Sequence, residues 1–110
     1  MDIDRSSIDD VVVMTLTGKL DVAGSQKAQE TLLPAVTSGG KVIVDMTACD
    51  YVASSGLRVL LIVAKQAAVA GCRAVLCGVQ PLVRDVIAMT GFDEVLEAFP
   101  TRLDALAALA

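Results

Sequence analysis

Short runs of β-branched and aliphatic residues alternate along this chain with segments of helical periodicity. Three runs are predicted to be strands: Val11–Thr17, Lys41–Asp45 and Cys72–Gly78. The middle run is continuously apolar over Val42–Val44, as expected for a strand buried on both faces. Strands that alternate with helices predict a sheet with parallel members that is covered by helices.

Shorter or weaker patterns complete this arrangement. A strand is expected around 3–8 and another over 94–99, and helices are expected over 23–36, 54–70, 81–90 and 101–109. Pro34 should bend or end the first helix. We predict an α/β fold of four to five strands with the order β-β-α-β-α-β-α-(β)-α, formed by residues 1–110 as one domain.

The segment 54–70 has the strongest helical period, and Gly71 follows it where a left-handed C-cap is expected. The predicted core stripe consists of Leu57, Leu60, Leu61, Ala64 and Ala68. The opposite side consists of Arg58, Ile62, Lys65 and Val69. That side is either simply solvated or, because it mixes aliphatic residues with cations, part of a surface that binds a partner.

Composition limits the functions open to the chain. Of 110 residues, 55% are apolar but only 3% aromatic, so the core must be aliphatic, and Met14, Met46 and Met89 are assigned to it. Nine basic against thirteen acidic residues give a net charge of −4, which offers no basic surface for nucleic acid. The chain has no His, and therefore no Ser-His or Cys-His catalytic system and no His-containing metal site. We expect neither an enzyme nor a bound cofactor.

Cys49, Cys72 and Cys77 form an odd set without metal-ligand spacing, so we expect free, buried thiols in a reducing cytoplasm. The polar N-terminus does not resemble a secretory signal. The longest apolar run, 57–64, is interrupted by Arg58 and is far shorter than the roughly 20 residues that span a bilayer. The expected location is the cytoplasm, without membrane association.

The segment 45–58 holds the candidate functional residues, and we expect it to contain a strand end, a loop and the start of a helix. A serine at a helix start either caps the helix or serves a function, and the helix dipole there also favours an attached phosphate. Asp21 and Asp45 are each predicted to end a strand. There they would form a turn or cap, or lie near Ser54 and Ser55, because sites in α/β sheets gather at the carboxyl ends of strands.

Several motifs are similar to those of a known family. The run Tyr51–Leu61 resembles the signature loop and helix of STAS domains, specifically those of bacterial anti-sigma factor antagonists. Thr17–Asp21 resembles the T-G-x-L-D turn that follows the family's second strand, and Val42–Thr47 resembles its central strand and exit. Met89–Phe92 resembles the segment that closes its third helix. The resemblance covers about residues 10–108 and implies a mixed sheet with helices packed on it.

The resemblance implies a function for the serines. The family's phosphoserine falls on Ser54, with Ser55 as the alternative and Gly56 on the motif's glycine. In this family an anti-sigma factor, a serine kinase related to histidine-kinase ATPases, phosphorylates the antagonist. The unphosphorylated antagonist binds that kinase and frees the sigma factor, and a PP2C-type phosphatase resets the cycle.

One residue departs from the family pattern, since Ala53 stands where an Asp usually precedes the phosphoserine. Its absence should weaken phosphoryl transfer or shift the role of that Asp to Asp21 or Asp50. A phosphate would carry a charge of about −1.5 to −2 and repel Asp21, Asp45, Asp50 and any acidic partner surface. Arg58, Ile62 and Lys65 are the expected kinase-binding residues beside this segment.

Two alternative functions fit the same sequence features. The chain could be a non-phosphorylated STAS adaptor subunit of a lipid-transport or stressosome-like assembly. In that case the serine segment, residues 50–56, is only an interface. The chain could also be a response-regulator receiver with Asp45 as phosphoacceptor. Receivers, however, keep an acidic pair after the first strand, whereas Asp9 and Asp10 precede the strand here.

Overall fold

The computed structural model describes residues 1–91 and 95–110. The strands are β1 (Asp2–Ile8), β2 (Val11–Leu20), β3 (Lys41–Val52), β4 (Arg73–Cys77) and β5 (Ala98–Phe99). The helices are α1 (Val22–Leu32), α2 (Ser54–Ala70), α3 (Pro81–Met89) and α4 (Arg102–Leu109), with a short 3₁₀ turn, η1 (Leu33–Ala35). The predicted order of elements is confirmed.

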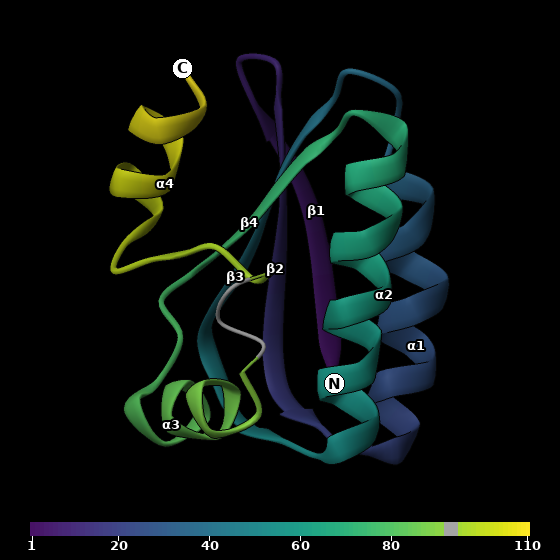
Figure 1. Cartoon of the computed structure of the whole chain (residues 1–110), viewed down its shortest axis with the longest axis vertical. Coiled ribbons are helices and arrows are strands. Elements are labelled where there is room, and N and C mark those ends of the chain that lie inside the picture. Colours follow the sequence, from purple (N-terminus) through teal and green to yellow (C-terminus); the bar gives the residue numbers. More distant parts are fainter. Residues whose placement is uncertain (92–94) are drawn as a thin grey trace.

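The strands form one mixed sheet in the order β1-β2-β3-β4-β5, in which β1 is antiparallel to β2 and all other pairs are parallel. Figure 1 shows α1 and α2 side by side along one face and α4 on the other. The starts of α1, α2 and α3 lie together at the lower end of this view, where β2, β3 and β4 finish. This end of the molecule collects the loops that follow the parallel strands.

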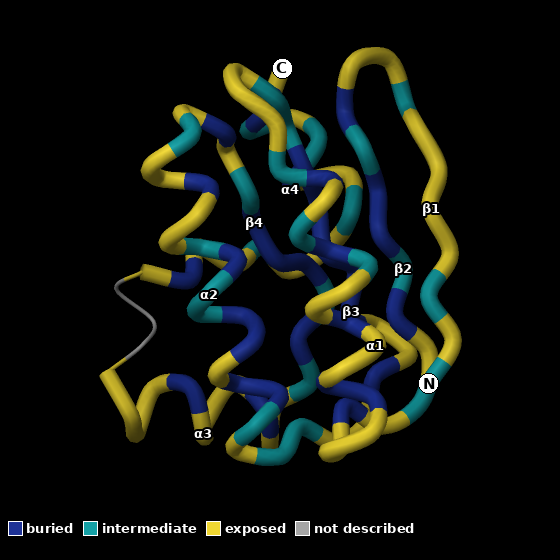
Figure 2. Tube along the Cα trace, turned by 90° about the vertical axis from the view of Figure 1, so that its right-hand side faces the viewer, coloured by how far each residue is buried: buried dark blue, intermediate teal, exposed yellow. Residues whose placement is uncertain are grey.

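The sheet separates two apolar clusters. On β3 the side chains of Val42, Val44 and Met46 belong to the larger cluster beneath α1 and α2, whereas Ile43 belongs to the smaller one beneath α4. This alternation follows from the period of two along a strand. Figure 2 shows buried positions along β2, β3 and β4 and mostly exposed ones along β1. Within the described part of the chain, no helix is both long and apolar enough to cross a membrane.

Strand ends differ most from the predictions. β3 continues to Val52, seven residues beyond its predicted end, so most of the expected loop is strand. β2 continues to Leu20, and only Asp21 of the predicted Thr17–Asp21 turn lies outside it. Gly18, with φ of 108°, lies beside a register irregularity between the two strands. Such irregularities let β2 and β3 stay paired as far as Leu20 and Val52 although the sequence is polar there.

The helices begin and end close to their predicted limits. α1 gives way to η1 around Pro34, and α2 ends at Gly71 in the left-handed conformation, as expected. The buried face of α2 is rotated from the predicted stripe, because the helix packs against both α1 and the sheet. Its buried residues are Gly56, Leu57, Val59, Leu60, Val63 and Ala67. Leu61 and Ala64 are half-buried and pack against the larger apolar cluster, whereas Ala68 is exposed, so the prediction was wrong for Ala68.

Met89 and the last strand differ from their predictions. Met14 and Met46 are fully buried as expected, but Met89 is 86% exposed, because the buried side of α3 is formed by Val83 and Ile87. The last strand is much shorter than the predicted 94–99, and both Glu94 and Phe92 lie outside the described residues.

Candidate functional site

The first turn of α2 lies directly against the end of β2. The backbone N–H of Ala53 donates to the carbonyl oxygen of Leu20 at 2.9 Å. A Cβ on Gly56 would come within 2.6 Å of the Leu20 Cγ and 2.8 Å of its carbonyl oxygen. Only glycine fits this approach, and it brings the serine segment beside Asp21 and the start of α1.

Ser54 is the first residue of α2, and its side chain is exposed. The N-cap is Ala53, in an extended conformation and without a side-chain cap, so the interpretation of a serine as the helix cap was wrong. The first N–H groups of a helix have no partner within it, and among the described residues the N-cap residue, Ala53, offers them no side-chain acceptor. The positive end of α2 therefore remains available beside the Ser54 hydroxyl.

Ser55 is half-buried, unlike Ser54, and contacts α1. Its Oγ lies 3.2 Å from the Oγ of Ser25, a residue that is only 3% exposed. Ser25 in turn donates to the carbonyl oxygen of Asp21. Sequence reasoning missed Ser25, and the only signal for it was a pair of small residues, Gly24 and Ser25, soon after Asp21.

Two of the predicted carboxylates lie at this end of the molecule. Asp21 caps α1, since its Oδ1 accepts a hydrogen bond from the Gly24 N–H at 2.8 Å, which confirms the capping interpretation. Asp50 lies near the end of β3, where its Oδ1 is 3.7 Å from the Nζ of Lys19. Both Asp21 and Asp50 are exposed. A charge added at Ser54 would therefore enter an end of the molecule that already carries two exposed carboxylates, one of them paired with Lys19.

Asp45 does not belong to this site, and the prediction that it ends a strand near the serines was wrong. Because β3 continues to Val52, Asp45 lies within the strand, paired with Thr15 of β2 and Cys77 of β4. Its side chain alternates with those of Val44 and Met46 and so faces α4, on the opposite side of the sheet from α2.

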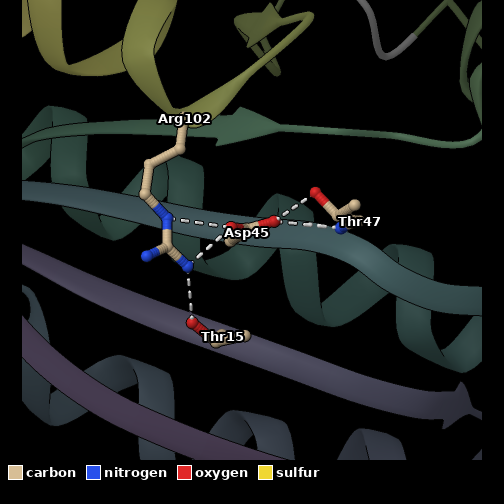
Figure 3. Close-up of polar contacts among 4 residues, drawn as sticks. All are labelled: Thr15, Asp45, Thr47 and Arg102. Carbon is tan, nitrogen blue, oxygen red and sulfur yellow. Dashed lines mark hydrogen bonds and ion pairs between the residues drawn. The ribbon is translucent and has the colours of Figure 1, made fainter.

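The Asp45 carboxylate is part of a polar cluster of four residues (Figure 3). One oxygen accepts from the Arg102 Nε and Nη2 at 3.0 and 2.8 Å, and Arg102 also donates to Thr15. The other oxygen accepts from the backbone N–H and hydroxyl of Thr47 at 3.0 and 2.6 Å. Burial alone would raise the pKa of Asp45, but these hydrogen bonds and the Arg102 charge outweigh it and lower that pKa.

The predicted partner face of α2 lies away from the core. Arg58 and Lys65 are exposed, Ile62 is half-buried, and Val69 is 84% exposed. These residues share one side of the helix that begins at Ser54. The prediction that this side faces solvent is confirmed for Arg58, Lys65 and Val69 but not for the half-buried Ile62, and a role in binding a partner stays a prediction.

All three cysteines are free and buried, as expected. Burial and the neighbouring Asp45 charge raise the pKa of Cys77 to about 12. Burial also raises the pKa of Cys49. The raised pKa values disfavour the thiolate form of Cys49 and Cys77, and all three buried thiols pack within the fold.

The family model of the STAS domain matches residues 2–105. Over 101 residues the chain is 35% identical to a Bordetella bronchiseptica protein named "Putative anti-sigma factor antagonist BtrV". The aligned region covers 91% of this chain and 84% of that protein. The chain belongs to the anti-sigma factor antagonist family of STAS domains. This family is regulatory rather than catalytic.

Solved structures agree with this STAS fold. An anti-sigma-factor antagonist (STAS) domain protein from Planctomyces limnophilus matches with a TM-score of 0.88 at 24% identity, over 98% of this chain and 97% of that one. The antagonist SpoIIAA in its unphosphorylated form matches with a TM-score of 0.80 at 20% identity, over 98% of this chain and 96% of SpoIIAA. The phosphorylated form of Bacillus SpoIIAA matches with a TM-score of 0.76 at 19% identity, over 99% of this chain and 100% of SpoIIAA.

Proposed function

We propose that this STAS domain is a phosphorylatable switch that acts by exchange of partners. Unphosphorylated, it binds an anti-sigma factor serine kinase of the histidine-kinase-like ATPase type and releases the sigma factor held by that kinase. Phosphorylation at Ser54 ends the binding, and a PP2C-type phosphatase restores it. The observation that carries this proposal is the exposed Ser54 hydroxyl at the uncapped start of α2, where the family motif has its phosphoserine.

The surroundings of Ser54 support a phosphate switch. Unpartnered N–H groups and the positive end of the helix dipole favour an anion at this position. The same phosphate would add about −1.5 to −2 charges beside Asp21 and Asp50, so it would change the surface that a partner meets. The switch would then be mainly electrostatic, with little refolding.

We propose that the outer face of α2 extends the binding surface from Ser54 along the helix. Arg58, Ile62 and Lys65 combine two exposed cationic side chains with a half-buried aliphatic one on the same side of the helix. Aliphatic contacts there would supply affinity, and the cations would select an acidic partner surface.

The proposed switch also implies how the domain is organised and where it is located. Residues 1–110 would act as a single domain that binds no cofactor, nucleic acid or membrane and leaves the chemistry of ATP to the kinase. A cytoplasmic location fits the three free thiols, because cysteines stay reduced in that compartment.

Phosphorylation can be tested directly. The protein is incubated with its candidate kinase and ATP, and the added phosphate is located by mass spectrometry in the wild type, Ser54→Ala and Ser55→Ala. We expect one phosphate on Ser54, unchanged in Ser55→Ala and lost in Ser54→Ala. A kinase that binds the protein tightly and yet adds no phosphate to either serine would contradict the switch and favour a non-phosphorylated adaptor in a lipid-transport or stressosome-like assembly.

A further inference from the structure

Ser54 and Ser55 are adjacent hydroxyls, and the kinase must distinguish them. Ser54 is exposed, whereas Ser55 is half-buried and its Oγ lies 3.2 Å from the Ser25 Oγ. The direction of this hydrogen bond can be worked out. A serine hydroxyl has a single proton, and that of Ser25 is donated to the Asp21 carbonyl oxygen, which can only accept. Ser55 is therefore the donor to Ser25.

The three groups form a chain in which Ser55 donates to Ser25 and Ser25 donates to the Asp21 carbonyl. Successive hydroxyls in such a chain polarise and strengthen one another. Ser25 is 3% exposed, so water cannot easily replace Ser55 as its donor. The Ser55 hydroxyl is thus directed toward α1, away from the solvent that Ser54 faces.

Close backbone packing fixes Ser25 relative to Ser55. A Cβ on Gly24 would come within 2.5 Å of the Lys19 carbonyl oxygen, so α1 starts tightly against the end of β2. Gly56 brings the start of α2 equally close to Leu20 on the same strand. The two helix starts have little freedom to separate, and the serine contact between them is held in place.

We propose that Ser25 is a positioning residue that directs phosphoryl transfer to Ser54 by holding the neighbouring Ser55 hydroxyl. This inference rests on the proposed function. In the transfer, the Ser54 Oγ forms a bond to the γ-phosphorus of ATP, the bond from that phosphorus to ADP breaks, and the hydroxyl proton passes to a base on the kinase. Ser55 can do the same only after it turns away from Ser25 and breaks the hydrogen-bond chain.

The test measures how phosphate is divided between the two serines. Wild type and Ser25→Ala are incubated with the kinase and ATP, and the ratio of Ser55 to Ser54 phosphate is determined by fragmentation mass spectrometry. Loss of a hydrogen bond of ordinary strength corresponds to a roughly threefold to tenfold change, so we expect that rise in the ratio for Ser25→Ala. Thr31→Ala is the matched control, because it removes a similar hydroxyl-to-carbonyl bond on α1, to Lys27, without touching Ser55.

A second variant separates positioning from folding. Ser25→Cys keeps nearly the side-chain volume but forms only weak hydrogen bonds, so it should raise the ratio with little loss of stability. A wild-type ratio in both Ser25 variants, or an equal rise in Thr31→Ala, would overturn the inference while leaving the switch intact. A wild type that takes no phosphate at either serine would overturn the proposed function and this inference with it.

Discussion

The guanidinium of Arg102, in the first turn of α4, donates two hydrogen bonds to a single carboxylate oxygen of Asp45 on β3, 57 positions earlier in the chain. α4 is also fixed to the sheet by a small apolar cluster that includes Ala105 and Leu109, and by a hydrogen bond from Arg73 of β4 to the Ala108 carbonyl oxygen. The ion pair therefore joins the C-terminal helix to the centre of the sheet, on the side opposite the serine segment.

Arg102→Ala should lower the free energy of unfolding by about 2 kcal/mol, because it removes both charge-assisted hydrogen bonds from the buried Asp45 carboxylate. This loss of stability is smaller than that expected for a fully buried ion pair, since the Arg102 side chain is 39% exposed. Urea denaturation gives the difference, with the exposed Arg84→Ala as control, expected within about 0.5 kcal/mol of wild type. Equal stability of the two variants would contradict a structural role for the ion pair.

Asp45 should also make stability depend on pH in acid. Its pKa in the folded protein lies below the ordinary value of 3.8, so its contribution is fully present above that value and is lost as the pH falls through the folded pKa. The stability difference between wild type and Asp45→Asn should stay constant from about pH 7 to about pH 5 and shrink below about pH 4. A difference that grows in acid would contradict the assigned pKa direction.

The sequence predicted the elements well because their signals are local. The period of Ser54–Ala70 and the glycine after it are readable without knowledge of the fold. The position of Asp45 was not readable, because it depends on how far β3 stays paired with β2 and on Arg102 at a distant point in the chain. Ser25 was missed for the same reason, since its contact with Ser55 exists only after α1 and α2 pack.

Gly56→Ala should disturb the serine segment through packing. The added Cβ would meet the Leu20 side chain and backbone, and overpacking of this kind costs about 1–3 kcal/mol. Gly39→Ala is a useful comparison, because its Cβ meets nothing within 4 Å and only its φ of 71° is unfavourable. We expect thermal melts to show that Gly56→Ala is destabilised. In the kinase assay, phosphorylation at Ser54 should be reduced in Gly56→Ala but not in Gly39→Ala. Phosphorylation reduced equally in both variants would contradict a specific role for this contact.

The thiols should be inert in the folded protein. Cys49, Cys72 and Cys77 are buried, and the pKa of Cys77 is raised to about 12, so little thiolate exists or is accessible near neutral pH. We expect a thiol reagent such as DTNB to react with all three only as the protein unfolds in denaturant. Rapid reaction of any cysteine in buffer alone would contradict the observed burial.

Ser54→Asp should have opposite effects on stability and on binding. A negative charge at the start of α2 should raise the free energy of unfolding by about 0.3–1 kcal/mol through the helix dipole. The same charge should weaken kinase binding, so the loss of affinity would not come from unfolding. Ser54→Asn, which is close in size but neutral, is the matched control.

Calorimetric titration of the kinase with unphosphorylated protein and with protein phosphorylated at Ser54 tests the switch most directly. We predict that the phosphorylated form binds at least about tenfold more weakly, which corresponds to about 1.4 kcal/mol. Equal affinity of the two forms would contradict a phosphate switch at Ser54.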